Sequence, residues 1–371
     1  MFSLFHPQFA VCNSAMRPPV WAKFAILFVL VVACVLTLAG CDDRHAKNGS
    51  DVPEVLAVIG ATGSGPGEFI YPRAIDIETD GSIYVVDKTG RVQHLAQDGK
   101  FLDGFSMPEI EAGKPTGVTI GPDGNIYVAD THYHRVMVYD TKGKLLRQFG
   151  HQGTDGGGFI YPTDVAFVGA GDGKKILVTE YGGNDRISVF TPDGKFISSF
   201  GSLGSGDGQF SRPAAMAVDE ARNLLYVADA CNHRIAVYDI VQTATTATPA
   251  AEAQSTQRKL NESSSSLRSL RLGGDSIDFK LKQYIGSPGS AAGQLRYPYG
   301  LALMADGMLV VCEYGNNRLQ TFDAQGRSMR IYGGPGRDPG QLAFPWAVAV
   351  DRSGTAYVVD AGNNRVQKWR L

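Results

Sequence analysis

Three histidines of this sequence are candidate ligands for a metal ion. His132 and His134 are one residue apart, and His233 lies in a similar segment further along the chain, within an Asn-His-Arg motif. Three neutral imidazoles that converge on one ion form the minimal catalytic zinc site. Two aspartates, Asp76 and Asp164, are candidates for calcium, which prefers oxygen ligands. No segment has the Gly-x-Ser-x-Gly pattern of a serine hydrolase.

A second pattern couples an acid to an arginine four to six residues later. The six pairs are Asp87–Arg91, Asp130–Arg135, Glu180–Arg186, Asp229–Arg234, Glu313–Arg318 and Asp360–Arg365. An arginine guanidinium can bridge a carboxylate and nearby loop carbonyls with several directed donors. Because a catalytic pair would occur once rather than six times, the recurrence favours a structural role. We call them the blade ion pairs, because each pair is expected to lie within one blade of the β-propeller that the repeats predict below.

Each pair belongs to a repeated unit of four short strands. Every unit opens at a proline, and the six prolines are Pro72, Pro115, Pro162, Pro213, Pro298 and Pro345. The proline is followed by a first strand, a turn and an apolar second strand that ends in the acid. A polar loop then leads to a third strand, which begins at the arginine, and to a fourth strand. Six such units predict an all-β, six-bladed β-propeller with four antiparallel strands per blade. The last unit lacks its fourth strand, and the N-terminal strand at 54–60 is predicted to complete that blade.

The repeated unit resembles the NHL repeat. Gly-x-Phe-x-x-Pro precedes most first strands, and Asp-Ala-Cys-Asn-His-Arg at 229–234 is similar to the central motif of that repeat. The resemblance covers residues 54–371 apart from one insertion, and it implies a propeller. Some related propellers are metal-dependent, including a lyase that releases amidated peptides through histidines around its central channel. Others bind RNA.

The first 53 residues predict export and membrane attachment. The apolar run at 24–40 follows Arg17 and Lys23 and ends in Leu-Ala-Gly-Cys. This ending resembles a bacterial lipoprotein signal, which implies a signal peptide at 1–40, a lipidated Cys41 and a flexible tether over 41–53. Asp42 resembles the signal that retains lipoproteins on the periplasmic side of the inner membrane. An uncleaved membrane-spanning helix is the alternative.

One segment interrupts the repeats. Residues 242–276 are rich in Thr, Ala and Ser and lack strand periodicity. They predict a disordered insertion between the third and fourth strands of blade four. Cys231 and Cys312 stand at different positions of their repeats, so we expect buried thiols rather than a disulfide.

Residues that differ between the repeats predict the binding site. Arg73, Tyr133, Tyr299 and Trp346 lie in loops that ring the central channel, and aromatic faces with a few polar groups suit a sugar, a peptide or a small amphipathic molecule. The formal net charge of −2 and the lack of a basic run argue against nucleic acid. We therefore predict a monomeric protein- or ligand-binding module without a cofactor. A metal-dependent hydrolase or lyase, lactonase-like or peptidyl-amidoglycolate-lyase-like, is the alternative.

Overall fold

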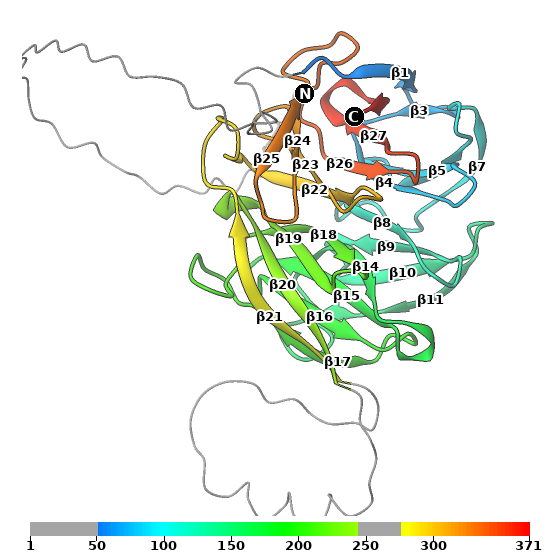
Figure 1. The fold of residues 1–371 in the computed structure, drawn as a ribbon. Coiled ribbons are helices and arrows are strands. Elements are labelled where there is room, and N and C mark those ends of the chain that lie inside the picture. The colour runs from blue at the N-terminus through cyan, green and yellow to red at the C-terminus, as the bar shows by residue number, and fades with distance from the viewer. Residues whose placement is uncertain (1–50, 244–275) are drawn as a thin grey trace, which may run out of the picture. The chain divides into compact units, whose positions relative to one another are not determined.

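A computed structural model describes residues 51–243 and 276–371 of the chain. This part of the chain contains six four-stranded antiparallel sheets, which we call the blades (Figure 1). Blade one contains β4 (Pro72–Ile77), β5 (Ile83–Asp87), β6 (Arg91–Leu95) and β7 (Phe101–Ser106). Blade two contains β8 (Gly117–Ile120), β9 (Ile126–Asp130), β10 (Arg135–Tyr139) and β11 (Leu145–Phe149). Blade three contains β14 (Tyr161–Val168), β15 (Lys175–Tyr181), β16 (Arg186–Phe190) and β17 (Phe196–Phe200).

The second half of the chain continues the same order. Blade four contains β18 (Pro213–Asp219), β19 (Leu224–Asp229), β20 (Arg234–Thr243) and β21 (Ser276–Ile285). Blade five contains β22 (Pro298–Leu303), β23 (Leu309–Glu313), β24 (Arg318–Phe322) and β25 (Ser328–Tyr332). Blade six contains β26 (Ala347–Val350), β27 (Thr355–Asp360), β28 (Arg365–Arg370) and β1 (Glu54–Ile59).

Short elements lie in the loops between these strands. Two parallel strand pairs are β2 (Ala61–Thr62) with β3 (Glu68–Phe69) and β12 (His151–Gln152) with β13 (Gly158–Phe159). The 3-10 helices are η1 (Thr131–Tyr133), η2 (Gly171–Gly173), η3 (Ala230–Asn232) and η4 (Ala361–Asn363). Within residues 51–243 and 276–371, no helix is long and apolar enough to cross a membrane.

The blades close into a ring. Their innermost strands contact one another in the order β4, β8, β14, β18, β22, β26 and back to β4. β1 pairs antiparallel with β28, and Arg370 Nη1 donates to Glu54 Oε2 over 2.7 Å. The N-terminal strand therefore completes the last blade and leaves no open edge at the seam. The predicted six-bladed propeller is confirmed.

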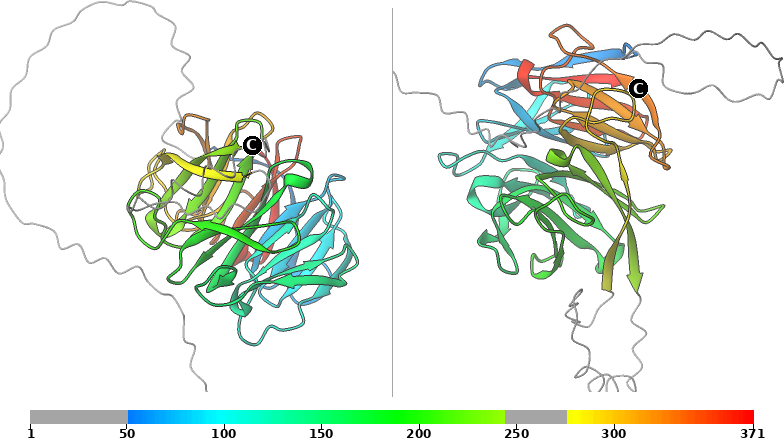
Figure 2. Two further views of the ribbon diagram at one scale, coloured as in Figure 1. Left: turned by 90° about the horizontal axis from the view of Figure 1, so that it is seen from below. Right: turned by 90° about the vertical axis from the view of Figure 1, so that its left-hand side faces the viewer.

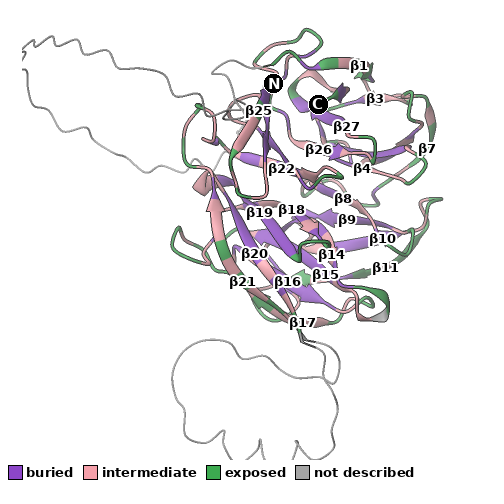
Figure 3. Ribbon diagram, in the orientation of Figure 1, coloured by how far each residue is buried: buried purple, intermediate pink, exposed green. Residues whose placement is uncertain are grey.

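Packing between neighbouring blades supplies the hydrophobic core. Six clusters of buried side chains each join two adjacent blades, as Tyr226 and Val237 of blade four do with Val311 of blade five. Most of β9 and β10 is coloured as buried in Figure 3. The second strand of each blade has both faces in such contacts, and every residue of β5 and β9 is buried. This double burial explains the continuous apolar runs of the second strands.

The structure changes two predicted boundaries. β20 and β21 pair as far as Thr243 and Ser276, so both ends of the predicted insertion 242–276 are strand (Figure 2). Asp51, at the end of the predicted tether, donates its N–H to Ile331 O over 2.7 Å, which covers part of the β25 edge. The predicted signal peptide, Cys41, Asp42 and residues 244–275 of the insertion lie outside the described residues.

The two cysteines of the propeller are not joined by a disulfide. Cys312 is buried in β23, and burial raises the pKa of its thiol well above the ordinary value. Cys231 in η3 is half-buried rather than buried.

Candidate functional site

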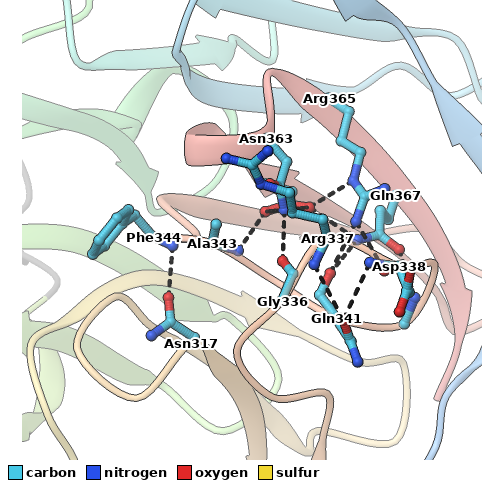
Figure 4. A network of polar contacts seen from close by, with 12 residues as sticks. Asn317, Gly336, Arg337, Asp338, Gln341, Ala343, Phe344, Asn363, Arg365 and Gln367 are labelled. Carbon is cyan, nitrogen blue, oxygen red and sulfur yellow. Dashed lines mark hydrogen bonds and ion pairs between the residues drawn. The ribbon is translucent and has the colours of Figure 1, made fainter.

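The blade ion pairs tie each polar loop to its own blade. All six acids contact their arginines, with N–O distances of 2.5 to 3.0 Å. In blade six, Arg365 Nε donates to Asp360, and its Nη2 donates to the carbonyls of Asp338 and Gln341 over 3.0 and 3.1 Å (Figure 4). The acid also accepts the Ala343 N–H over 2.7 Å. These contacts fix the loop and satisfy its backbone groups, as expected of a structural role.

Blade two departs from this arrangement. In blades three to six an asparagine also donates to the acid, as Asn363 does to Asp360. Tyr133 occupies the equivalent position in blade two, and its hydroxyl accepts the Ala112 N–H over 3.1 Å. Its ring lies 5.1 Å from the Arg135 guanidinium. Tyr133 thus packs over the blade ion pair and, contrary to the sequence-based prediction, does not line the central cavity.

The residue before the arginine of a blade ion pair joins one blade to the next. This position has positive φ in all six blades, at Gly90, His134, Asp185, His233, Asn317 and Asn364. In blades three to six its side chain accepts a backbone N–H of the following blade: Asn364 accepts that of Tyr71 over 2.7 Å, and His233 Nδ1 accepts that of Tyr297 over 3.1 Å. The same contact joins Asn317 to Phe344 (Figure 4).

The predicted histidine trio does not assemble, and each of the three histidines has a separate backbone contact. His233 is engaged with blade five, while His134 Nδ1 contacts Ile160 O and His132 Nδ1 accepts the Lys114 N–H over 3.1 Å. Within residues 51–243 and 276–371, no group of three or more His, Cys, Asp or Glu side chains is arranged to hold a metal ion. Burial lowers the pKa of His132 and of His233.

The contact between neighbouring blades also positions an arginine at the channel. Arg212 precedes Pro213 and has φ of 58°, a backbone conformation that bulky residues rarely adopt. Asp185 of blade three holds it by accepting its N–H over 2.6 Å. The Arg212 guanidinium then lies 4.9 Å from the ring of Tyr181 and 5.3 Å from the ring of Tyr299.

A second arginine lies close by. Arg73 follows Pro72 in β4, and its guanidinium lies 5.1 Å from the Trp346 ring. Its Nε is buried and donates to no described residue. Arg73 and Arg212 repel each other, which together with burial lowers the pKa of Arg73. Within the described residues, neither guanidinium forms an ion pair with a carboxylate, and tyrosines and the other arginine are among the titratable groups nearest to each.

Aromatic rings complete this site. We define the channel mouth as Arg73, Tyr181, Arg212, Tyr299 and Trp346, all of which line one cavity of about 350 Å³. The Tyr299 and Trp346 rings are 5.0 Å apart, and Tyr314 packs behind them, 4.9 Å from Tyr299. Burial raises the pKa of Tyr299 to about 12, so its hydroxyl is protonated near neutral pH. The mouth therefore offers two cations and a set of aromatic faces.

Two carboxylates lie on the channel wall below the mouth. Asp76 of β4 accepts the N–H of Ile120 over 2.7 Å, and Asp164 of β14 accepts that of Met216 over 2.8 Å. Each contact bridges two blades. Burial raises the pKa of Asp76 to about 6 and that of Asp164 to about 7.

The structure brings Arg73, Tyr299 and Trp346 together, as their loop positions suggested, but the sequence analysis missed Arg212 and Tyr181. A signal for Arg212 was present. The residue before the repeated proline is aromatic in blades one, three, five and six, and arginine replaces it at 212. An arginine in place of the usual aromatic residue indicates that the fold does not require an aromatic side chain at this position.

Comparisons with known proteins identify the repeat. The NHL repeat matches residues 113–139 and 342–369, and a family described as a 6-bladed beta-propeller matches residues 167–257. The chain carries NHL repeats. The blade ion pairs of this NHL-repeat propeller at 130–135 and 360–365 lie inside the two matched NHL repeats.

Amidating enzymes are among the relatives of this NHL-repeat propeller. The mouse "Peptidyl-glycine alpha-amidating monooxygenase" is 34% identical over 178 residues, which are 45% of this chain and 17% of that protein. The "Probable peptidyl-alpha-hydroxyglycine alpha-amidating lyase" of Caenorhabditis elegans is 26% identical over 241 residues, 61% of this chain and 67% of that protein. The chain thus spans less than a fifth of the mouse relative.

Solved structures share the fold. A streptogramin B lyase superposes with a TM-score of 0.51 at 17% identity, covering 82% of this chain and 94% of that one. A protein of unknown function from Bacteroides thetaiotaomicron superposes with a TM-score of 0.54 at 16% identity, covering 87% and 73%. At these identities the likeness concerns the propeller alone.

Proposed function

We propose that this NHL-repeat propeller is a binding module whose channel mouth holds an organic anion with an apolar or aromatic part. One observation carries the proposal: Arg73 and Arg212 lie half-buried beside one cavity without a carboxylate partner among the described residues. A guanidinium binds a carboxylate with two parallel hydrogen bonds, and aromatic faces cover the apolar remainder of such a ligand. A peptide terminus and an acidic sugar derivative share this chemistry.

Fluorescence of Trp346 tests the proposal. Phenylacetate should quench the tryptophan fluorescence of the protein, whereas phenylacetamide, which has the same shape without the charge, should not. Trp346→Phe should remove the signal. Arg73→Met should weaken phenylacetate binding at least about tenfold, the loss expected when a charge-assisted contact is removed. Arg352→Met, in the exposed turn between β26 and β27, is the matched control. Equal quenching by both probes would refute an anion site.

In this proposal the propeller is a monomer outside the cytoplasm, held at the membrane by lipid on Cys41. The Leu-Ala-Gly-Cys ending of the apolar run and the following Asp42 support it. Cys41→Ser should abolish incorporation of radiolabelled palmitate. Unchanged membrane association of the variant, without labelling of the wild type, would show that the apolar run is an uncleaved anchor.

A metal-dependent lyase is the second candidate, because the worm relative is named as an amidating lyase and matches 61% of this chain. Metal analysis of the purified protein separates the two. One zinc ion per chain that is lost when both His132 and His134 are changed to Ala would favour the lyase. Metal content that is unaffected by these changes would favour the binding module.

A further inference from the structure

The two sides of the central channel differ in chemistry. On blades one to three the wall carries hydroxyl and carboxyl groups, namely Asp76, Thr116, Thr119, Thr163 and Asp164. On blades four to six the wall below the mouth is apolar, with Ala217, Leu301 and Val348 among its side chains. If closing the ring of blades were the only requirement, the same small residues could line the channel in every blade. The asymmetry therefore indicates a ligand with one polar and one apolar side.

Charges of opposite sign occupy different depths of this cavity. The cations Arg73 and Arg212 lie at the mouth. Asp76 and Asp164 lie on strands that lead away from it, and the hydrogen bonds that their carboxylates accept come from backbone N–H groups. Neither aspartate forms an ion pair with a described lysine, arginine or histidine. Each carboxylate oxygen that accepts one N–H retains capacity for a second donor.

We propose that the channel binds a zwitterion, with its anionic group between Arg73 and Arg212 and an ammonium group at Asp76 and Asp164. The inference rests on the proposed function, because it takes the mouth as the anion site and adds a cation site below it. An ammonium group is the natural counterpart of a carboxylate pair that is lined by hydroxyls, since it donates three hydrogen bonds. The methylene groups between the two charges would lie against the apolar wall of blades four to six.

Strand geometry sets the length of such a ligand. Asp76 follows Arg73 by three residues on β4, which separates their backbones by about 10 Å at the usual rise of a strand. An extended ω-amino acid with five methylene groups places its two charges about 7 Å apart, which is comparable with the separation between these two levels of the cavity.

Three matched probes test the proposal on the wild-type protein. They are 6-aminohexanoate, which carries both charges, hexanoate, which carries the anion, and hexylamine, which carries the cation. By Trp346 fluorescence, 6-aminohexanoate should bind about tenfold or more tightly than hexanoate, because it gains a charge-assisted contact. Hexylamine should bind least well, because the two arginines repel it at the mouth. 4-Aminobutyrate, which cannot reach both sites, should bind no better than hexanoate.

Variants assign the gain to the aspartates. Asp164→Asn retains an oxygen that can accept the Met216 N–H, so it preserves the contact between blades three and four. It should remove most of the advantage of 6-aminohexanoate and leave hexanoate binding unchanged. Asp123→Asn, in an exposed turn, makes the same chemical change away from the channel and should have no effect.

The outcomes separate this inference from the proposed function. Hexanoate that binds as tightly as 6-aminohexanoate would overturn the cation site and leave the anion site standing. A 6-aminohexanoate advantage that survives in Asp164→Asn and in Asp76→Asn would also overturn it. If neither hexanoate nor phenylacetate binds, the anion site itself is wrong, and the proposed function fails with it.

Discussion

Arginines of two kinds lie around the loops that ring the channel, and they differ in their partners. Arg365 donates to the Asp360 carboxylate and to two loop carbonyls, and each other blade ion pair joins an arginine to an acid. Arg73 and Arg212 have aromatic rings beside them and no carboxylate within the described chain. An arginine that recurs in every blade and is paired with an acid stabilises the fold. An unrepeated arginine without a partner is available to a ligand, and substitutions can test this difference.

The largest effect should follow from breaking a complete blade ion pair. Asp360 is fully buried and accepts hydrogen bonds from Ala343, Asn363, Arg365 and Gln367. Asp360→Ala should lower the free energy of unfolding by about 3 to 5 kcal/mol, because the half-buried Arg365 guanidinium and the amides of Asn363 and Gln367 lose their carboxylate acceptor. Urea denaturation of the variant and the wild type measures the loss. A loss below about 1 kcal/mol would contradict a structural role.

The same change in blade two should cost less. Asp130 accepts a hydrogen bond from Arg135 at Oδ2, but its buried Oδ1 accepts none from the described residues. Asp130→Ala should therefore lower the free energy of unfolding by about 1 to 3 kcal/mol, since fewer contacts are lost. Denaturation in parallel with Asp360→Ala provides the comparison. Tyr133→Asn, which restores the donor found in the later blades, should raise the cost of removing Asp130 towards that in blade six.

The channel aspartates should make stability depend on pH. Burial raises the pKa of Asp164 from its ordinary value of 3.8 to about 7, so the folded protein retains a proton that the unfolded chain releases. Its contribution to stability is therefore fully present below about pH 4 and is lost as the pH rises to about 7. Denaturation of wild type and Asp164→Asn across this range should show the wild type losing stability relative to the variant. A constant difference between the two proteins would show that the pKa of Asp164 is not raised.

The sequence predicted the features that all repeats share, but only some of the features that are unique to single repeats. Periodic prolines, acids and arginines gave the ring and the blade ion pairs, because each contact within a blade has a fixed sequence spacing. Trp346 and Tyr299 stood out because threonine or alanine occupies their position in blades two to four. Arg212 was missed because its direction depends on a positive φ that Asp185 of another blade secures. Tyr133 was misplaced because η1 turns its ring onto Arg135, away from the cavity.

The smallest effect on stability should come from a mouth arginine. Arg73→Met removes a half-buried charge that no described carboxylate compensates, and the methionine stem still packs against Trp346. The lost cation–π contact, about 0.5 to 2 kcal/mol, opposes the relief of burying an unpaired charge next to Arg212. The free energy of unfolding should stay within about 1 kcal/mol of the wild type, while phenylacetate binding weakens at least about tenfold.

This last result would distinguish the two kinds of arginine most directly. Arg365→Met makes the same chemical change in a blade ion pair, and it leaves the buried Asp360 carboxylate with one charged partner fewer. It should therefore destabilise the protein by several kcal/mol more than Arg73→Met does. If both variants lose the same stability, Arg73 is a structural residue. In that case the mouth would not be an anion site.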